Sequence, residues 1–245
     1  MRAAVQALSA ARVDLMLDPE VLLIDTSPGV EHSLKQALAA FGLPMPDEGL
    51  DFFRQTQLPL PQLFAKLLST DEREHILQFF NCFNEYFDKT GRYMGRLRAG
   101  STRFLANIAA SGRFDCHYLS HIGKHASAQL LDAYGIGHFF RSTIATERQT
   151  CPRTRLGLMR DAVRTRRTPD RQWLLLSDHP WELMTAETLG IRAIALGYGR
   201  SPLRVLSTCP AEAIAASVGD VEAHLLDPAE HGNVLRLQPR RTQVH

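Results

Sequence analysis

The hydrophobic positions in the second half of the chain follow two alternating periodicities. Short apolar runs typical of buried strands are followed by longer stretches with apolar residues at helical spacing. The strands are expected at residues 114–119, 142–145, 173–176 and 193–196, and the helices at residues 102–110, 125–134, 156–163 and 183–189. Alternation at this spacing predicts an α/β fold, a doubly wound parallel sheet with helices on both faces.

A further strand is predicted near the start of the chain. The apolar run Val21–Ile24 lies between two prolines and is typical of a strand buried on both faces, with Asp25 directly after it. Upstream of this run, residues 5–17 indicate a loose helix that ends before Pro19. Residues 1–19 are therefore expected to form a helical extension.

Residues 33–98 have a different, entirely helical pattern. Ser33 is expected to cap the first helix of this segment, and phenylalanines then recur at helical spacing, which favours a helix-packing core over a ligand site. The segment is predicted to be an inserted helical cap. The expected boundaries are 20–32 and 99–226 for the α/β core, 33–98 for the cap and 227–245 for a poorly ordered tail.

Composition narrows the classes of function. The chain has 245 residues and a formal net charge of +2, which is too small to favour nucleic acid or an anionic membrane as a partner. No apolar segment approaches the length of a membrane span. The four cysteines have no metal-ligand or disulfide spacing, so buried thiols and a reducing cytoplasm are expected.

Three polar residues follow predicted strands. Asp25 comes after the first strand, Ser120 after residues 114–119, and Asp178 two residues after the strand at 173–176. Ligands of a doubly wound sheet bind beyond the carboxyl ends of its strands. Two carboxylates and a hydroxyl at that edge predict a site for a divalent cation and a phosphate group, although each residue alone is also a common helix cap.

The order and spacing of these motifs resemble the haloacid dehalogenase superfamily, in particular the phosphoglycolate phosphatase-like proteins with a helical cap. The resemblance covers about residues 20–226. The stretches that carry it are Val21–Asp25, Leu130–Ile136 with Phe139–Phe140, Ser177–Glu182, and Ala186 with Gly190–Ile194. It implies a Rossmann-like core and an aspartyl-phosphate intermediate on Asp25.

The resemblance also implies a general acid and a lysine that this chain lacks at the expected positions. Ser27 stands where the family has the acidic residue two positions after the nucleophile, and positioned acid-base groups contribute roughly 10²- to 10⁴-fold to rate. Cys151 stands at the position of the lysine, and a neutral thiol supplies no fixed charge. Among the nearby arginines, Arg148, Arg153 or Arg155 could lend positive charge.

Magnesium is the cofactor that the resemblance implies. Its ligands would be Asp25, Asp178 and Glu182, and Glu182 replaces the usual aspartate with a longer side chain. Mg²⁺ requires near-ideal octahedral geometry, so this change is expected to weaken metal binding. Ser120 would donate its hydroxyl to the phosphate.

Two functions remain open. The first is a slow Mg²⁺-dependent phosphomonoester hydrolase acting on a small phosphorylated molecule through Asp25, with metal-free dehalogenase chemistry as a variant. The second is a non-catalytic scaffold that binds a ligand or a protein partner, since several catalytic positions are altered together. The sequence gives the two roughly equal support and does not identify a substrate.

Overall fold

The computed structural model describes residues 12–47, 60–120, 122–147, 152–165 and 171–226. The chain divides into two compact units. The first comprises residues 1–24 and 97–245, and the second comprises residues 25–96. The expected cap boundaries were 33 and 98, so the second unit starts eight residues earlier and ends two residues earlier than that segment.

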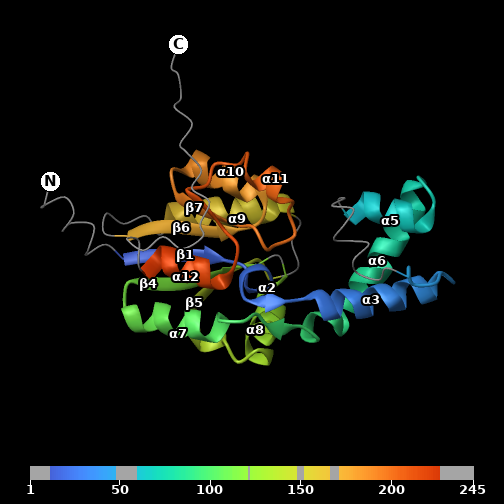
Figure 1. Cartoon of the computed structure of the whole chain (residues 1–245), viewed down its shortest axis with the longest axis horizontal. Coiled ribbons are helices and arrows are strands. Elements are labelled where there is room, and N and C mark those ends of the chain that lie inside the picture. Colours follow the sequence, from blue (N-terminus) through green and yellow to red (C-terminus); the bar gives the residue numbers. More distant parts are fainter. Residues whose placement is uncertain (1–11, 48–59, 121, 148–151, 166–170, 227–245) are drawn as a thin grey trace, which may run out of the picture. The chain divides into compact units, whose positions relative to one another are not determined.

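The first unit is built on a six-stranded sheet of order β5-β4-β1-β6-β7-β8 (Figure 1). All neighbouring strands are parallel. The strands are β1 Arg12–Leu17, β4 Phe114–Leu119, β5 Phe140–Ile144, β6 Arg171–Ser177, β7 Arg192–Leu196 and β8 Ala213–Ala215. The predicted doubly wound α/β architecture is confirmed.

Helices cover both faces of this sheet. One face packs against α7 Ser101–Ser111, α8 Lys124–Ala133 and α12 Val218–Leu226, and the other against α9 Pro152–Thr165, α10 Pro180–Leu189 and α11 Leu203–Leu206. Alternation along β1 explains the two layers, because Leu15 and Leu17 join the first core cluster whereas Met16 joins the second. No helix among the described residues is long and apolar enough to cross a membrane.

The predicted N-terminal helix is wrong where the structure describes it. Residues 12–17 form β1, the strand that lies between β4 and β6. Val13, Leu15 and Leu17 alternate with Asp14 and Met16, which is the two-residue period of a strand. This period is hard to recognise in the sequence because Asp14 is a charged residue at a fully buried position, with its carboxylate inside the sheet. Residues 1–11 lie outside the described part of the chain.

The strand predicted at Val21–Ile24 is also wrong. Pro19–Leu22 form a single helical turn, α2, and Ile24–Asp25 form β2, which pairs with β3 Arg96–Leu97 in a separate two-stranded sheet. The run is apolar because all four of its residues are buried, at 4% exposure or less, against the sheet of the first unit. A short buried run does not by itself distinguish a strand from a helical turn.

The second unit is helical, with its own core. It contains α3 Ser27–Ala40, α5 Leu60–Leu68, α6 Arg73–Lys89 and the short helix η1 Gly91–Tyr93. Phe64, Phe79 and Phe83 pack in its core, as the aromatic stripe predicted. The predicted cap role of Ser33 is wrong, since α3 begins at Ser27 and the Ser33 hydroxyl instead donates to the Gly29 carbonyl, 2.7 Å away, within the helix.

A buried polar network crosses the centre of the sheet. The Asp14 carboxylate accepts a hydrogen bond from His117 Nε2 at 2.9 Å and pairs with the Arg171 guanidinium, while Nδ1 of His117 lies 2.8 Å from the Ser142 hydroxyl. Burial alone would raise the pKa of Asp14, but the bonds to His117 and Arg171 outweigh it and hold the pKa below its ordinary value of 3.8. The network therefore connects β1, β4, β5 and β6, and Asp14 is ionised within it.

Asp14→Asn is expected to destabilise the first unit by about 3–5 kcal/mol near neutral pH, because it leaves buried partners uncompensated. The pKa of Asp14 is lower in the folded protein than its ordinary value of 3.8. The carboxylate's contribution to the free energy of unfolding is therefore complete above pH 3.8, and it is lost as the pH falls through the lower folded pKa. Urea unfolding of wild type and variant should give a constant difference down to about pH 5 that shrinks below pH 4. An equal stability of the two proteins at pH 7 would contradict this.

Gly29→Ala is expected to disrupt the second unit. A Cβ at Gly29 would lie 1.8 Å from the carbonyl oxygen of Gly91, a clash with backbone that no side-chain rotation relieves. Gly157→Ala in α9 is the matched control, since nothing lies within 4 Å of its Cβ position and alanine favours a helix by up to about 1 kcal/mol over glycine. Hydrogen exchange of residues 27–40 and 73–89 should accelerate in Gly29→Ala alone.

Candidate functional site

Three buried polar residues follow three adjacent strands of the sheet. Asp18 comes directly after β1, Ser120 directly after β4, and Asp178 directly after β6. These three residues are 2%, 0% and 4% exposed, in that order. Because β4, β1 and β6 are parallel neighbours, these residues lie at the same edge of the sheet.

The local sequence fixes the position of Asp18. Pro19 occupies the first turn of α2, and Asp18 precedes it as the N-cap, with Oδ1 accepting a hydrogen bond of 3.0 Å from the Glu20 backbone amide. The same turn buries Glu20, whose Oε2 lies 3.5 Å from the Tyr118 hydroxyl. Two carboxylates separated by one residue are thus held at the end of the central strand.

A buried arginine connects this turn to α10. Arg155, from α9, places Nη1 3.1 Å from Asp18 Oδ2 and Nε 2.9 Å from Glu182 Oε1, and its side chain is 11% exposed. Burial would lower the pKa of Arg155, but the charges of Glu182 and Asp18 outweigh it and raise that pKa. Arg155 is therefore a fixed cation shared by two carboxylates.

Two further carboxylate oxygens have partners, one from the end of β6 and one from the loop after β7. The Ser177 hydroxyl donates to Glu182 Oε2 at 2.6 Å, and the backbone amide of Arg200 donates to Asp178 Oδ2, also at 2.6 Å. The Arg200 guanidinium is exposed, with Nε 3.6 Å from the same oxygen. The loop after β7 comes this close because Gly199 has no side chain, as a Cβ there would lie 2.4 Å from that of Asp178.

Ser120 closes the turn after β4. Its hydroxyl donates to the Ile122 carbonyl at 2.8 Å and accepts from the Ile122 amide at 3.1 Å and from the Ser127 hydroxyl at 2.8 Å. These bonds orient the hydroxyl at the sheet edge and also hold the start of α8.

Comparison with known proteins agrees with this topology. No model of a known protein family matches the chain. A 5'-nucleotidase from Pseudomonas aeruginosa is 24% identical over 187 residues, which span 76% of this chain and 83% of that protein. A haloacid dehalogenase-like hydrolase from Streptococcus pneumoniae superposes with a TM-score of 0.69 at 19% identity, over 89% of this chain and 99% of that one.

Two further solved structures have the same arrangement. A protein described as a predicted phosphatase from Clostridium acetobutylicum gives a TM-score of 0.66 at 19% identity, over 88% of this chain and 98% of its own. One described as a predicted phosphoglycolate phosphatase from Haemophilus somnus gives 0.60 at 17% identity, over 88% and 97%. The chain therefore has the same fold as these proteins.

The predicted site residues are divided between the two units. Ser120, Asp178 and Glu182 belong to the first unit. Asp25 and Ser27 belong to the second, where Asp25 Oδ1 accepts from the Ser27 amide at 3.1 Å and Oδ2 lies 3.4 Å from Nε of Arg96. The strand placement on which the choice of Asp25 rested is therefore wrong.

The other predicted positions concern positive charge near the site. Cys151 and Arg148 lie outside the described residues, as does the side chain of Arg153. Of the three arginines that the sequence suggested, Arg155 forms ion pairs with the carboxylates of Asp18 and Glu182.

Sequence reasoning missed Asp18 and Glu20. The signal was present, because Asp18-Pro19-Glu20 directly follows the alternating stretch Val13–Leu17. Pro19 was interpreted as the end of a helix, whereas proline is equally common in a helix's first turn. Asp25, seven residues further along, was chosen because the more apolar run Val21–Ile24 was assigned as the strand in place of β1.

The magnesium ion that the sequence resemblance implies does not fit these side chains as they are arranged. Mg²⁺ needs carboxylate oxygens that converge on it, but Arg155 pairs with one oxygen each of Asp18 and Glu182. Asp178 Oδ2 accepts from the Arg200 amide. Within the described ranges, no three His, Cys, Asp or Glu residues are grouped so as to hold a metal ion.

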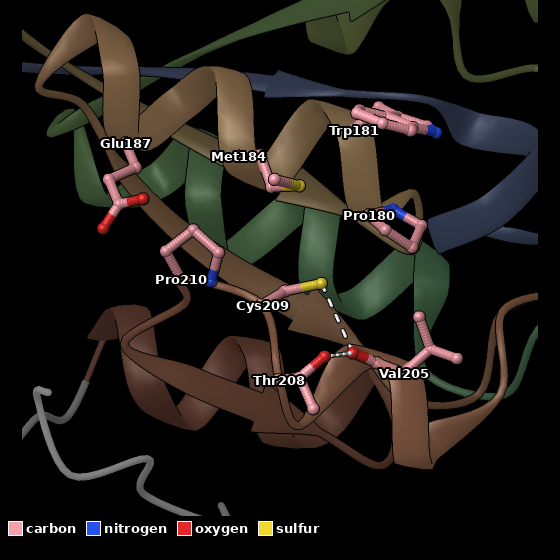
Figure 2. Close-up of a pocket in the computed structure, with 8 residues that line it drawn as sticks. All are labelled: Pro180, Trp181, Met184, Glu187, Val205, Thr208, Cys209 and Pro210. Carbon is pink, nitrogen blue, oxygen red and sulfur yellow. Dashed lines mark hydrogen bonds between the residues drawn. The ribbon is translucent and has the colours of Figure 1, made fainter.

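A separate depression of about 530 Å³ lies on the outer side of α10 (Figure 2). Trp181, Met184 and Glu187 project from α10 on one side of it, and Val205, Thr208 and Cys209 lie opposite. Its lining contains neither Asp18 nor Asp178. The depression is therefore distinct from the carboxylate cluster.

Gly199→Ala is expected to displace the loop after β7 from Asp178 and to cost about 1–3 kcal/mol, the usual range for overpacking. The hydrogen bond from the Arg200 amide should be lost, which amide exchange at Arg200 would reveal. Gly219→Ala is the control, because its Cβ would meet the Ser217 hydroxyl at an ordinary 3.6 Å. Equal Tm values for the two variants would argue against the close packing described.

Proposed function

We propose that this chain is a phosphomonoester hydrolase of the haloacid dehalogenase type, with Asp18 as nucleophile and Glu20 as general acid and base. The observation that carries the proposal is the position of Asp18 at the end of the central strand, with Ser120 and Asp178 after the two flanking strands. Asp25, which the sequence suggested, has no such position in the sheet.

The reaction proceeds in two steps on these residues. A carboxylate oxygen of Asp18 attacks phosphorus and the bond to the leaving oxygen breaks, while Glu20 donates a proton to the departing alcohol. Water then attacks the phosphorus of the aspartyl-phosphate, Glu20 accepts a proton from it, and the bond to Asp18 breaks. Inorganic phosphate leaves and both carboxyl groups return to their starting states.

The Arg155 guanidinium supplies the fixed positive charge that the sequence had placed in doubt. It lies 3.1 Å from the nucleophile and is buried, where a preorganised charge has its largest effect on developing negative charge. The Ser120 hydroxyl lies at the end of β4 and donates to the Ile122 carbonyl, so it would have to give up that hydrogen bond in order to donate to a phosphate oxygen.

The substrate class is a small phosphorylated molecule. This rests on the geometry above and on two comparison proteins, which are described as a 5'-nucleotidase and a predicted phosphoglycolate phosphatase. We infer no individual substrate. The carboxylate cluster would contact the phosphate group, which sugar, nucleoside and acid phosphates share, so it does not distinguish among them.

A non-catalytic scaffold remains the second candidate, and the engaged carboxylates favour it. Asp18 has partners on both oxygens, Glu182 likewise, and Asp178 accepts from the Arg200 amide. A cluster in which carboxylates are already compensated is also what a purely structural ion-pair network looks like.

The first test is hydrolysis of para-nitrophenyl phosphate by wild type, Asp18→Asn and Asp25→Asn, with Mg²⁺ or with a chelator present. Wild type should release phosphate and Asp18→Asn should fall to the uncatalysed rate, because the amide is a poor nucleophile. Asp25→Asn should retain most activity. Glu20→Gln should lose roughly 10²- to 10⁴-fold in kcat.

The paired aspartate variants make the result decisive. If Asp25→Asn is inactive and Asp18→Asn is not, the nucleophile is misassigned. If all four proteins are equally inert towards aryl and alkyl phosphates, the hydrolase proposal fails and the scaffold remains. Circular dichroism and the thermal midpoint of each variant establish that loss of activity is not loss of fold.

A further inference from the structure

The carboxylate cluster contains more negative charge than its buried cation balances. Asp18, Glu20, Asp178 and Glu182 are each 7% exposed or less. Arg155 contributes one buried positive charge among them. Buried carboxylates require compensation by cations or hydrogen bonds, so the identity of the cation at this position determines what else the site can bind.

Arg155 makes the contacts that a bound cation would make. Its guanidinium bridges carboxylates from two different elements, the turn after β1 and the first turn of α10, at 3.1 Å and 2.9 Å. A divalent ion at the same place would have to draw on the same oxygens, since Asp18 and Glu182 both face Arg155. The guanidinium and a metal ion therefore compete for one set of ligands.

We propose that Arg155 is the resident cation of this site and that it excludes divalent metal ions. The oxygens of Asp18, Asp178 and Glu182 do not converge on a metal ion in the present arrangement, and they move together around one only when Arg155 is removed. This inference concerns cation binding and does not depend on whether the chain hydrolyses phosphate. It assigns to a side chain the place that a magnesium ion is expected to take.

Competition favours the arginine for two reasons. The guanidinium is attached to α9, so it is present at a high effective concentration regardless of the metal in solution. A guanidinium also stays protonated under all ordinary conditions, so no pH change releases the carboxylates to a metal. Arg200 does not have this role, because its side chain is 68% exposed and its Nε lies 3.6 Å from Asp178 Oδ2, so solvent screens this pair more than it screens the contacts of Arg155.

The test is direct metal binding by the full chain. Mn²⁺ is titrated into wild type, Arg155→Ala and Arg155→Gln, and free Mn²⁺ is followed by electron paramagnetic resonance. Arg160→Ala is the matched control, since Arg160 lies on the same helix but is exposed. Wild type and Arg160→Ala should bind Mn²⁺ weakly or not at all, and both Arg155 variants should bind it at least about tenfold more tightly.

A second substitution locates the acquired site. In the double variant Arg155→Ala with Glu182→Gln, Mn²⁺ affinity should fall back towards that of wild type, because one ligand has lost its charge. Removing one member of a buried ion pair is strongly destabilising, so the Arg155 variants are also unfolded by heat with and without Mg²⁺. Metal should raise their Tm and leave that of wild type unchanged.

Clear outcomes would overturn the proposal. Tight Mn²⁺ binding by wild type would show that Arg155 does not exclude the metal. Failure of both Arg155 variants to bind Mn²⁺, or to gain stability from Mg²⁺ if they are poorly folded, would show that the carboxylates do not form a latent metal site. Phosphatase activity enters neither readout, so failure here is distinguishable from failure of the proposed hydrolase.

Discussion

The pairing of β1 with β4 on one side and β6 on the other is the constraint from which the candidate site follows. The register of these parallel strands places Leu17 opposite Tyr118 and Leu176. Asp18 follows Leu17 directly, whereas Ser120 and Asp178 come two residues after their paired positions, so all three reach the same edge of the sheet. The buried bond between Asp14 and His117 reinforces this alignment from within the sheet. Asp18 is at the site because the strand that precedes it has no freedom to slide.

Electrostatic compensation then determines the character of the site. Carboxylates gathered at the end of a sheet repel one another and are costly to bury without partners. In this chain the compensation comes from Arg155, one turn into α9 from the position where the sequence motif led us to expect a lysine. A fixed positive charge therefore lies beside Asp18, the proposed nucleophile, and it comes from an arginine of α9 in place of a lysine. That substitution also brings the cation into contact with Glu182.

The sequence predicted the sheet better than it predicted the site. Strands β4 to β7 and the helices between them follow from periodicity because short strand-like runs alternate with longer stretches at helical spacing. The central strand did not, since its buried Asp14 breaks the apolar pattern and its partners His117 and Arg171 lie more than 100 residues away. Long-range charge pairing of this kind leaves no local signal. Asp178 and Glu182 belong to one contiguous motif, and the structure buries both beside β6. The wrong strand assignment led to the choice of Asp25 and left Asp18 out.

The central claim is that Asp18 is the carboxylate that the sheet presents for reaction. Borohydride trapping tests it most directly, because borohydride reduces an aspartyl-phosphate to homoserine and leaves free aspartate unchanged. The protein is treated during turnover of an aryl phosphate, digested and mapped by mass spectrometry. The account predicts homoserine at position 18 and unmodified Asp25. Homoserine at position 25, or none anywhere in a protein that is turning over substrate, would contradict it.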